Sequence, residues 1–165
     1  MNTTVDEIRG ALVRVGSRQL LLPNATISEV LSYSPPEPVA DAPEWLLGRL
    51  RWRGWRLPLV AFSLLSGQGA EAADLGSKVV VLKALGGDAR LPFFALLTHG
   101  FPRLVTIPAA SLLDVGDEAG VGEDGNDGTD AGLPTAVRAH VRLNDEDALI
   151  PDIDAIENAI RSALA

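Results

Sequence analysis

The sequence predicts an all-β fold with minor helices, and three features of its pattern support this. Apolar and polar residues alternate over short stretches, which is the period of a half-buried strand. Glycine, proline and asparagine separate these stretches at short intervals, as they do in barrels and sandwiches. Only residues 153–164 carry apolar side chains at helical spacing over several turns, so alternating strand and helix units are not expected.

The N-terminal region predicts a hairpin. Residues 11–15 and 18–22 are rich in β-prone side chains and flank Gly16-Ser17, which suits a two-residue turn. Pro23 ends the second strand because it has no N–H to donate. A short helix or turn is then expected over residues 24–31, capped by the asparagine that begins it.

The middle of the chain predicts a second hairpin. Over residues 49–53 arginines alternate with apolar residues, which places Leu50 and Trp52 on one face and the arginines on the other. Gly54 makes a tight return, and residues 55–60 resume the apolar face with a proline that suits an edge strand or a bulge.

The second half of the chain predicts further strands with little helix between them. Residues 62–67 resemble one helical turn ended by glycine. Further strands are expected at residues 78–85, 91–97, 101–107, 137–143 and 148–150. Asp154 is expected to cap the terminal helix.

Residues 114–134 are expected to form an acidic, glycine-rich flexible loop inserted in this fold. Between Asp114 and Gly132 the chain has seven acidic residues and no basic one, so this stretch cannot bury apolar surface. Its calcium-like start at Asp124 lacks the glycine and the closing glutamate that a calcium loop requires.

Residues with catalytic or metal-binding potential do not gather into a known motif. The chain has no cysteine, and neither His99 nor His140 stands at metal-ligand spacing. Neither a nucleophile elbow nor a phosphate-binding glycine loop is visible. We therefore expect no enzymatic activity, no catalytic residue, no metal and no cofactor.

Composition predicts a cytoplasmic protein without direct membrane insertion. No apolar run approaches the roughly 20 residues that a bilayer requires, and the first residues do not resemble a secretory signal. The absence of cysteine agrees with a reducing compartment. The net charge of −8 argues against general binding of nucleic acid.

The arginines between positions 49 and 56 leave three interpretations open. They can form a solvated strand face, or a protein interface in which the planar guanidinium pairs with carboxylates. They can also make a small β-barrel module that binds nucleic acid or an anionic ligand. Stacking on bases is disfavoured because Trp52 is expected to face the core. The residues concerned are Arg49, Arg51, Arg53 and Arg56.

The stretch from Trp45 to Val60 resembles the signature of the CheW family. That signature has a glycine, two apolar-type positions, Asn-Leu-Arg-Gly, further apolar positions and then Pro-Val-Ile-Asp-Leu. The matching positions here are Gly48, Arg53, Gly54 and Pro58. Upstream, Ile27-Ser28-Glu29-Val30 is similar to the family's apolar-x-Glu-apolar segment.

Departures from the signature suggest an accessory member of the family. Arg51-Trp52 stand where Asn-Leu is usual, Ala61 replaces the aspartate, and Leu97-Thr98 stand near the family's Val-Asp. These departures are similar to those of CheW-like proteins in type IV pilus (twitching) chemosensory systems.

The resemblance implies a single CheW-like domain over residues 1–165, built from two five-stranded Src-homology-3-type β-barrels packed together. It implies a non-enzymatic scaffold that couples a methyl-accepting chemoreceptor to a CheA-type histidine kinase in chemotaxis or twitching motility. The partner-binding residues that the resemblance carries over are Ile27, Glu29, Gly48, Arg51, Arg53 and Gly54.

Overall fold

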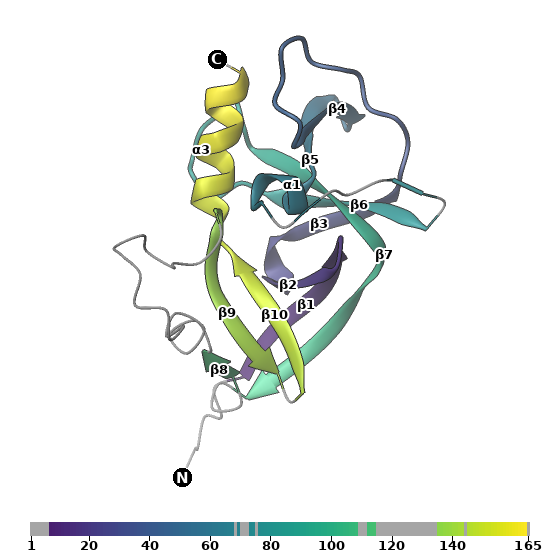
Figure 1. The fold of residues 1–165 in the computed structure, drawn as a ribbon. Coiled ribbons are helices and arrows are strands. Elements are labelled where there is room, and N and C mark those ends of the chain that lie inside the picture. Colours follow the sequence, from purple (N-terminus) through teal and green to yellow (C-terminus); the bar gives the residue numbers. More distant parts are fainter. Residues whose placement is uncertain are drawn as a thin grey trace, which may run out of the picture.

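The structure, a computed structural model, describes residues 7–67, 69, 73–74, 76–108, 112–114, 135–143 and 145–164. The described strands form one 10-stranded sheet in the order β3-β6-β7-β1-β2-β10-β9-β8, and β4 joins it through β5, which pairs with β7. The helices are short and lie against the sheet (Figure 1). The prediction of an all-β fold with minor helices is confirmed.

The elements follow the chain in a simple order. The strands are β1 (Glu7–Val15), β2 (Arg18–Pro23), β3 (Ile27–Ser32), β4 (Leu46–Trp52), β5 (Trp55–Val60), β6 (Ser77–Lys83), β7 (Phe93–Pro108), β8 (Leu112–Asp114), β9 (Val137–Leu143) and β10 (Glu146–Pro151). The helical elements are η1 (Asn24–Thr26), α1 (Phe62–Leu65) and α3 (Ile153–Leu164).

Strand β7 joins two groups of strands and curves along much of the molecule (Figure 1). Its first part pairs with β6 up to His99, and β1 pairs with it at His99 and again from Arg103 onward, with a register shift between the two. Between them Gly100 has a φ of 77°, a conformation that glycine adopts without strain. The prediction of two separate strands here was wrong, because the glycine bends the strand without ending its pairing.

The main core lies where the two groups of strands meet. It combines buried side chains of β1, β2, β5, β6, β7 and β10 with those of α1 and α3. Ile156 and Ile160 on α3 are fully buried in it, as their helical spacing predicts. Asp152 caps α3 by accepting the Ala155 N–H at 3.1 Å, so the prediction of Asp154 as the cap was wrong. The cap must precede the first helical residue, Ile153.

The predicted helix or turn over residues 24–31 was also wrong. Only η1 is helical, and the chain then continues as β3, which pairs with β6 through a register shift between Ile27 and Glu29. Val30 and Leu31 pack against different core clusters, as expected of neighbouring residues on a strand. Burial on both sides therefore outweighs the local capping signal.

Other predicted elements are confirmed. The turn at Gly16-Ser17 joins β1 to β2, and Gly67, with a φ of 73°, follows the single turn of α1. Pro58 lies just before Leu59, where β5 begins to pair with β7, so the missing N–H falls outside that pairing. The expected flexible loop over residues 114–134 lies outside the described residues, apart from Asp114 at the end of β8.

Candidate partner-binding site

The β4–β5 hairpin ends in a two-residue turn at Arg53-Gly54. Trp52 pairs with Trp55 across it, and the two turn residues have φ values of 47° and 81°, both positive as in a type I′ turn. The prediction that Arg53 continues the strand was wrong, because β4 ends at Trp52. Arg53 therefore stands at the tip of the hairpin and not on the face of the other arginines.

Trp52 connects this hairpin to β3. Its side chain is 7% exposed and packs against Leu57 and Val81, with the ring of Phe93 edge-on at a centroid distance of 5.0 Å. Its indole Nε1–H donates a hydrogen bond to the Glu29 carboxylate. This bond satisfies the one polar group of a buried tryptophan.

Glu29, Trp52 and Arg53 form what we call the Glu29–Trp52–Arg53 cluster. The Arg53 guanidinium carbon lies 4.8 Å from the Trp52 ring centroid, and its Nη2 lies 3.8 Å from Oε2 of Glu29. The Arg53 side chain is nevertheless 68% exposed. An exposed ion pair contributes only about 0–1 kcal/mol to stability, so the main effect of these contacts is to orient the guanidinium.

The two glycines of the predicted site have different structural roles. Gly48 is buried with a φ of 147°, and an added Cβ would lie 2.4 Å from the carbonyl oxygen of Glu37. Glu37 forms a backbone bridge to Arg49, with N–O distances of 2.9 and 2.8 Å. Gly48 thus allows the preceding loop to pack on β4, whereas Gly54 is exposed with nothing within 4 Å of an added Cβ.

The structure separates the two remaining predicted residues from the cluster. Arg51 lies on the opposite face of β4 from Trp52 and forms an exposed ion pair with Glu37, whose Oε1 lies 3.4 Å from its Nε. Ile27 is half-buried against the main core. Of the predicted residues, Glu29, Arg53 and the adjacent Gly54 therefore lie together.

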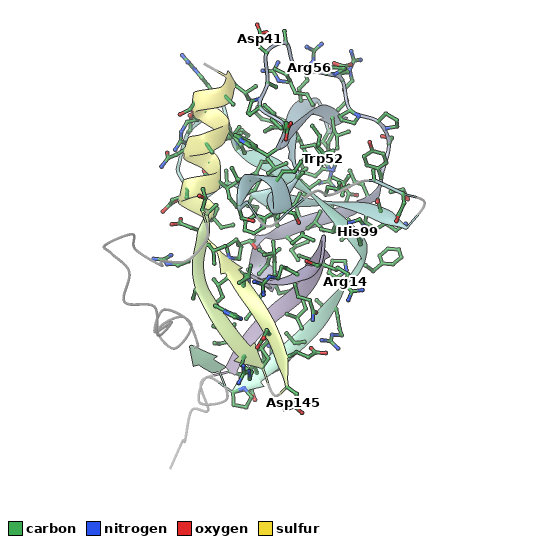
Figure 2. All side chains as sticks on the ribbon, viewed as in Figure 1. Arg14, Asp41, Trp52, Arg56, His99 and Asp145 are labelled. Carbon is green, nitrogen blue, oxygen red and sulfur yellow. The ribbon has the colours of Figure 1, made fainter. Side chains whose placement is uncertain are left out.

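Trp52 and Phe93 are residues of this site that the sequence analysis did not assign to it. The alternation correctly placed Trp52 on the buried face, where it cannot stack on a base (Figure 2). The signal that could have identified its second role is chemical, since a buried indole N–H requires an acceptor. Trp55, expected on the apolar face, is 43% exposed at the rim of the hairpin.

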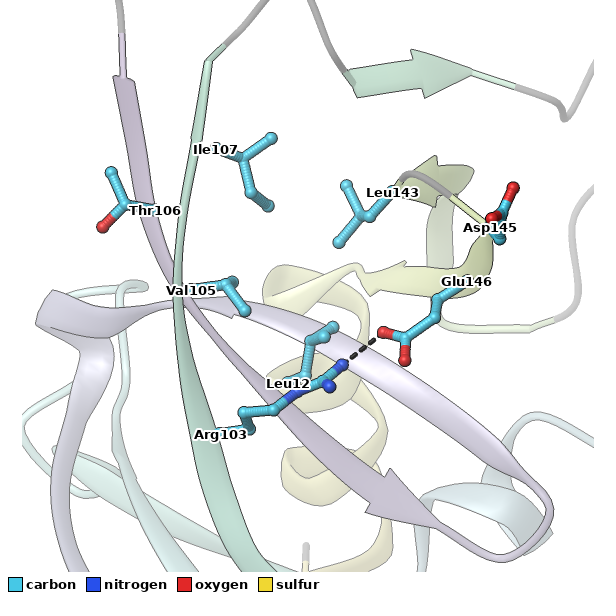
Figure 3. Close-up of a pocket in the computed structure, with 8 residues that line it drawn as sticks. All are labelled: Leu12, Arg103, Val105, Thr106, Ile107, Leu143, Asp145 and Glu146. Atoms are coloured by element: carbon cyan, nitrogen blue, oxygen red, sulfur yellow. Dashed lines mark hydrogen bonds and ion pairs between the residues drawn. The ribbon is translucent and has the colours of Figure 1, made fainter.

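A hollow of about 490 Å³ lies between β7 and the β9–β10 hairpin, away from this cluster (Figure 3). Leu12, Ile107 and Leu143 line it, and an ion pair between Arg103 and Glu146 crosses its edge. Among the described residues no group of three or more His, Cys, Asp or Glu side chains could hold a metal ion. The hollow therefore has a mixed lining, in which Thr106 and Asp145 accompany the apolar side chains and the Arg103–Glu146 ion pair.

The helices of the described part of the chain are all too short or too polar to span a bilayer.

The comparisons with known proteins agree on the fold. The chain is similar over 88% of its length to the scaffolding protein CheW from Thermoanaerobacter tengcongensis, of which it covers 89%, with a TM-score of 0.67 and 16% identity. This likeness confirms the predicted CheW-like fold of two Src-homology-3-like β domains, although the described strands pair as one sheet and not as closed barrels. No curated protein matches the chain.

The described strands and helices therefore have the CheW-type fold. The CheW-like domain matches residues 9–161, which is nearly the whole chain, and the protein belongs to the CheW-like domain family. Its members are non-enzymatic scaffold proteins of chemotaxis signalling, in agreement with the predicted adaptor role.

Proposed function

We propose that this protein couples a methyl-accepting chemoreceptor to a CheA-type histidine kinase, and that the Glu29–Trp52–Arg53 cluster is part of its receptor-facing surface. Family membership supports the adaptor role. The observation that carries the site is the exposure of Arg53 together with its fixed position over Trp52 and beside Glu29. Gly54 adds an open hairpin tip beside it.

The physical argument rests on preorganisation. A flexible arginine loses side-chain entropy when it binds, at a cost of about 0.5–1.5 kcal/mol. Arg53 already has its guanidinium placed by an aromatic face and a carboxylate, while most of its surface is free for a partner. A planar guanidinium binds a carboxylate through two parallel hydrogen bonds, and arginine is enriched among residues that dominate binding energy.

The proposed mechanism is positional. An adaptor of this kind holds kinase and receptor in one geometry, so that a change in the receptor can shift the equilibrium between kinase states. Both proposed partners have the relevant surfaces in the cytoplasm, where we also place this protein.

We further propose that the pathway is a type IV pilus system. At the position of the family's aspartate, Ala61 is fully buried and its N–H donates to the Trp45 carbonyl oxygen at 2.8 Å. Thr98, near the family's Val-Asp, is also fully buried. Neither position therefore carries the carboxylate that is usual in the family, a departure similar to that of the CheW-like proteins of type IV pilus systems.

A pull-down with the receptor's cytoplasmic fragment and the kinase tests the proposed site. We expect Arg53→Ala to weaken binding by about 1–3 kcal/mol, the range for losing a charged partner at an interface. Arg53→Asn serves as a second variant, because asparagine tolerates positive φ and Asn-Gly is favoured in this turn. It should weaken binding similarly while the fold keeps its stability.

Arg138→Ala is the matched control, since this arginine is exposed on β9, outside the β4–β5 hairpin. Wild-type affinity in both Arg53 variants, or an equal loss in Arg138→Ala, would contradict the proposed site. Failure of the wild-type protein to bind either partner would contradict the proposed function itself.

A further inference from the structure

A groove on the outer face of the β4–β5 hairpin has no role in the proposed receptor contact. Arg51 pairs with Arg56 and Arg49 with Pro58, so these residues share the face opposite Trp52. Arg49 and Arg56 line a groove of about 270 Å³ together with Arg90 from the β6–β7 connection. We call it the Arg49–Arg56–Arg90 groove.

The charge of this groove is uncompensated. Among the described residues its lining contains three arginines and no acidic residue. Within the described part of the chain, none of the three forms a side-chain ion pair, whereas Arg51 on the same face is paired with Glu37. The protein as a whole has a net charge of −8, so this face has the opposite sign to the whole molecule.

The groove also has an apolar lining. Trp55 is 43% exposed at its edge, and Phe93 and Leu164 contribute half-buried side chains from β7 and the end of α3. In Figure 1 the C-terminal end of α3 lies near β4 and β5, and Figure 2 shows Arg56 in that region. Exposed tryptophan combined with arginine is typical of residues that dominate protein interfaces.

We infer that the Arg49–Arg56–Arg90 groove docks a segment of a partner protein in which carboxylates flank an aliphatic or aromatic side chain. Each guanidinium can pair with a carboxylate, and the apolar lining accepts the side chain between them. A long polyanion fits less well, because three arginines neutralise few phosphates and the remaining surface of an acidic protein repels the others.

The test uses the full-length protein and a synthetic octapeptide, (Glu-Leu-Asp-Phe) repeated twice, with (Gln-Leu-Asn-Phe) repeated twice as the neutral probe. Binding is followed by fluorescence anisotropy and by the NMR signal of the Trp55 indole N–H, assigned with Trp55→Phe. We expect the acidic peptide to bind, to shift this signal and to weaken as salt is raised. The affinity of the neutral peptide should be lower by a factor of about ten or more.

Arg56→Gln/Arg90→Gln removes two exposed charges and should reduce acidic-peptide binding by about tenfold or more. Arg14→Gln/Arg138→Gln makes the same change in net charge on exposed residues outside the groove and should leave binding within about twofold. Arg53→Asn should also leave it unchanged, which separates this inference from the proposed receptor contact.

Four results would overturn the inference: no binding of the acidic peptide, equal binding of the neutral peptide, an equal loss in the Arg14/Arg138 control, or a Trp55 signal that does not move. Tighter binding of a 15-nucleotide oligothymidylate, or of vesicles of anionic lipid, that depends on Arg56 and Arg90 would also overturn it. Those outcomes would assign the groove to nucleic acid or to a membrane surface.

Discussion

The hydrogen bond between Trp52 on β4 and Glu29 on β3 is expected to contribute measurably to the free energy of unfolding. Trp52→Phe retains an aromatic ring against Phe93 but removes the only polar group of the side chain. A hydrogen bond to a charged group contributes about 1.5–3 kcal/mol. The Glu29 side chain is 37% exposed, so water can replace the lost donor and the lower end of that range applies.

Loss of packing adds to this cost. Truncating a buried tryptophan to alanine costs about 3–5 kcal/mol, and phenylalanine retains most of the contact, so we assign about 1 kcal/mol to the missing part of the ring. Trp52→Phe is therefore expected to lower the free energy of unfolding by about 2.5 kcal/mol. Urea unfolding followed by far-ultraviolet circular dichroism measures it without relying on tryptophan fluorescence.

A double-mutant cycle with Glu29→Ala isolates the hydrogen bond. In the Glu29→Ala background the acceptor is already absent, so Trp52→Phe should cost only the packing contribution of about 1 kcal/mol. The coupling free energy between Trp52 and Glu29 should then be about 1.5 kcal/mol. A coupling below about 0.5 kcal/mol, with unchanged m values, would refute the reasoning that this bond connects the two strands.

Three further predictions concern stability. Gly48→Ala places a Cβ 2.4 Å from the Glu37 carbonyl oxygen and should lower the free energy of unfolding by about 2 kcal/mol or more. Gly54→Ala meets no atom within 4 Å and should lower it only by the backbone strain of about 1 kcal/mol. Equal losses in the two variants would contradict the steric argument. Glu157 is fully buried and accepts two backbone N–H groups at 3.0 and 3.1 Å, so Glu157→Ala should lower the free energy of unfolding by about 2–4 kcal/mol in urea unfolding. Deletion of residues 116–131 should barely change Tm, because this acidic stretch cannot bury apolar surface; a large loss would show that it packs on the domain.

Local patterns predicted most of the strands because alternation and turn residues act over a few neighbours. The hairpin at Gly16-Ser17 and the helical spacing of Ile156 and Ile160 both follow from residues that lie close together in the chain. Where sequence analysis failed, the deciding interaction was distant. Glycine at position 100 does not end β7, and residues 27–32 become a strand because β6 is available to pair with them.

The candidate site shows the same division. Alternation was sufficient to place Trp52 inside and Arg51 outside, and the family motif pointed to Glu29 and Arg53. Neither alternation nor the family motif could show that Arg53 turns away from the other arginines at the hairpin tip. Neither could show that Gly48 is buried beneath the preceding loop.

The amino-acid sequence by itself determined the class of fold, the family and the absence of a recognisable catalytic motif, because these depend on periodicity, motif spacing and residue types. Only the tertiary structure decided which side chains meet. Glu29 and Trp52 are 23 residues apart, and Arg90 lies still further from Arg56. The members of each pair come together through strand pairing and core burial, which involve residues far apart in the chain. A pattern among neighbouring residues cannot specify such contacts.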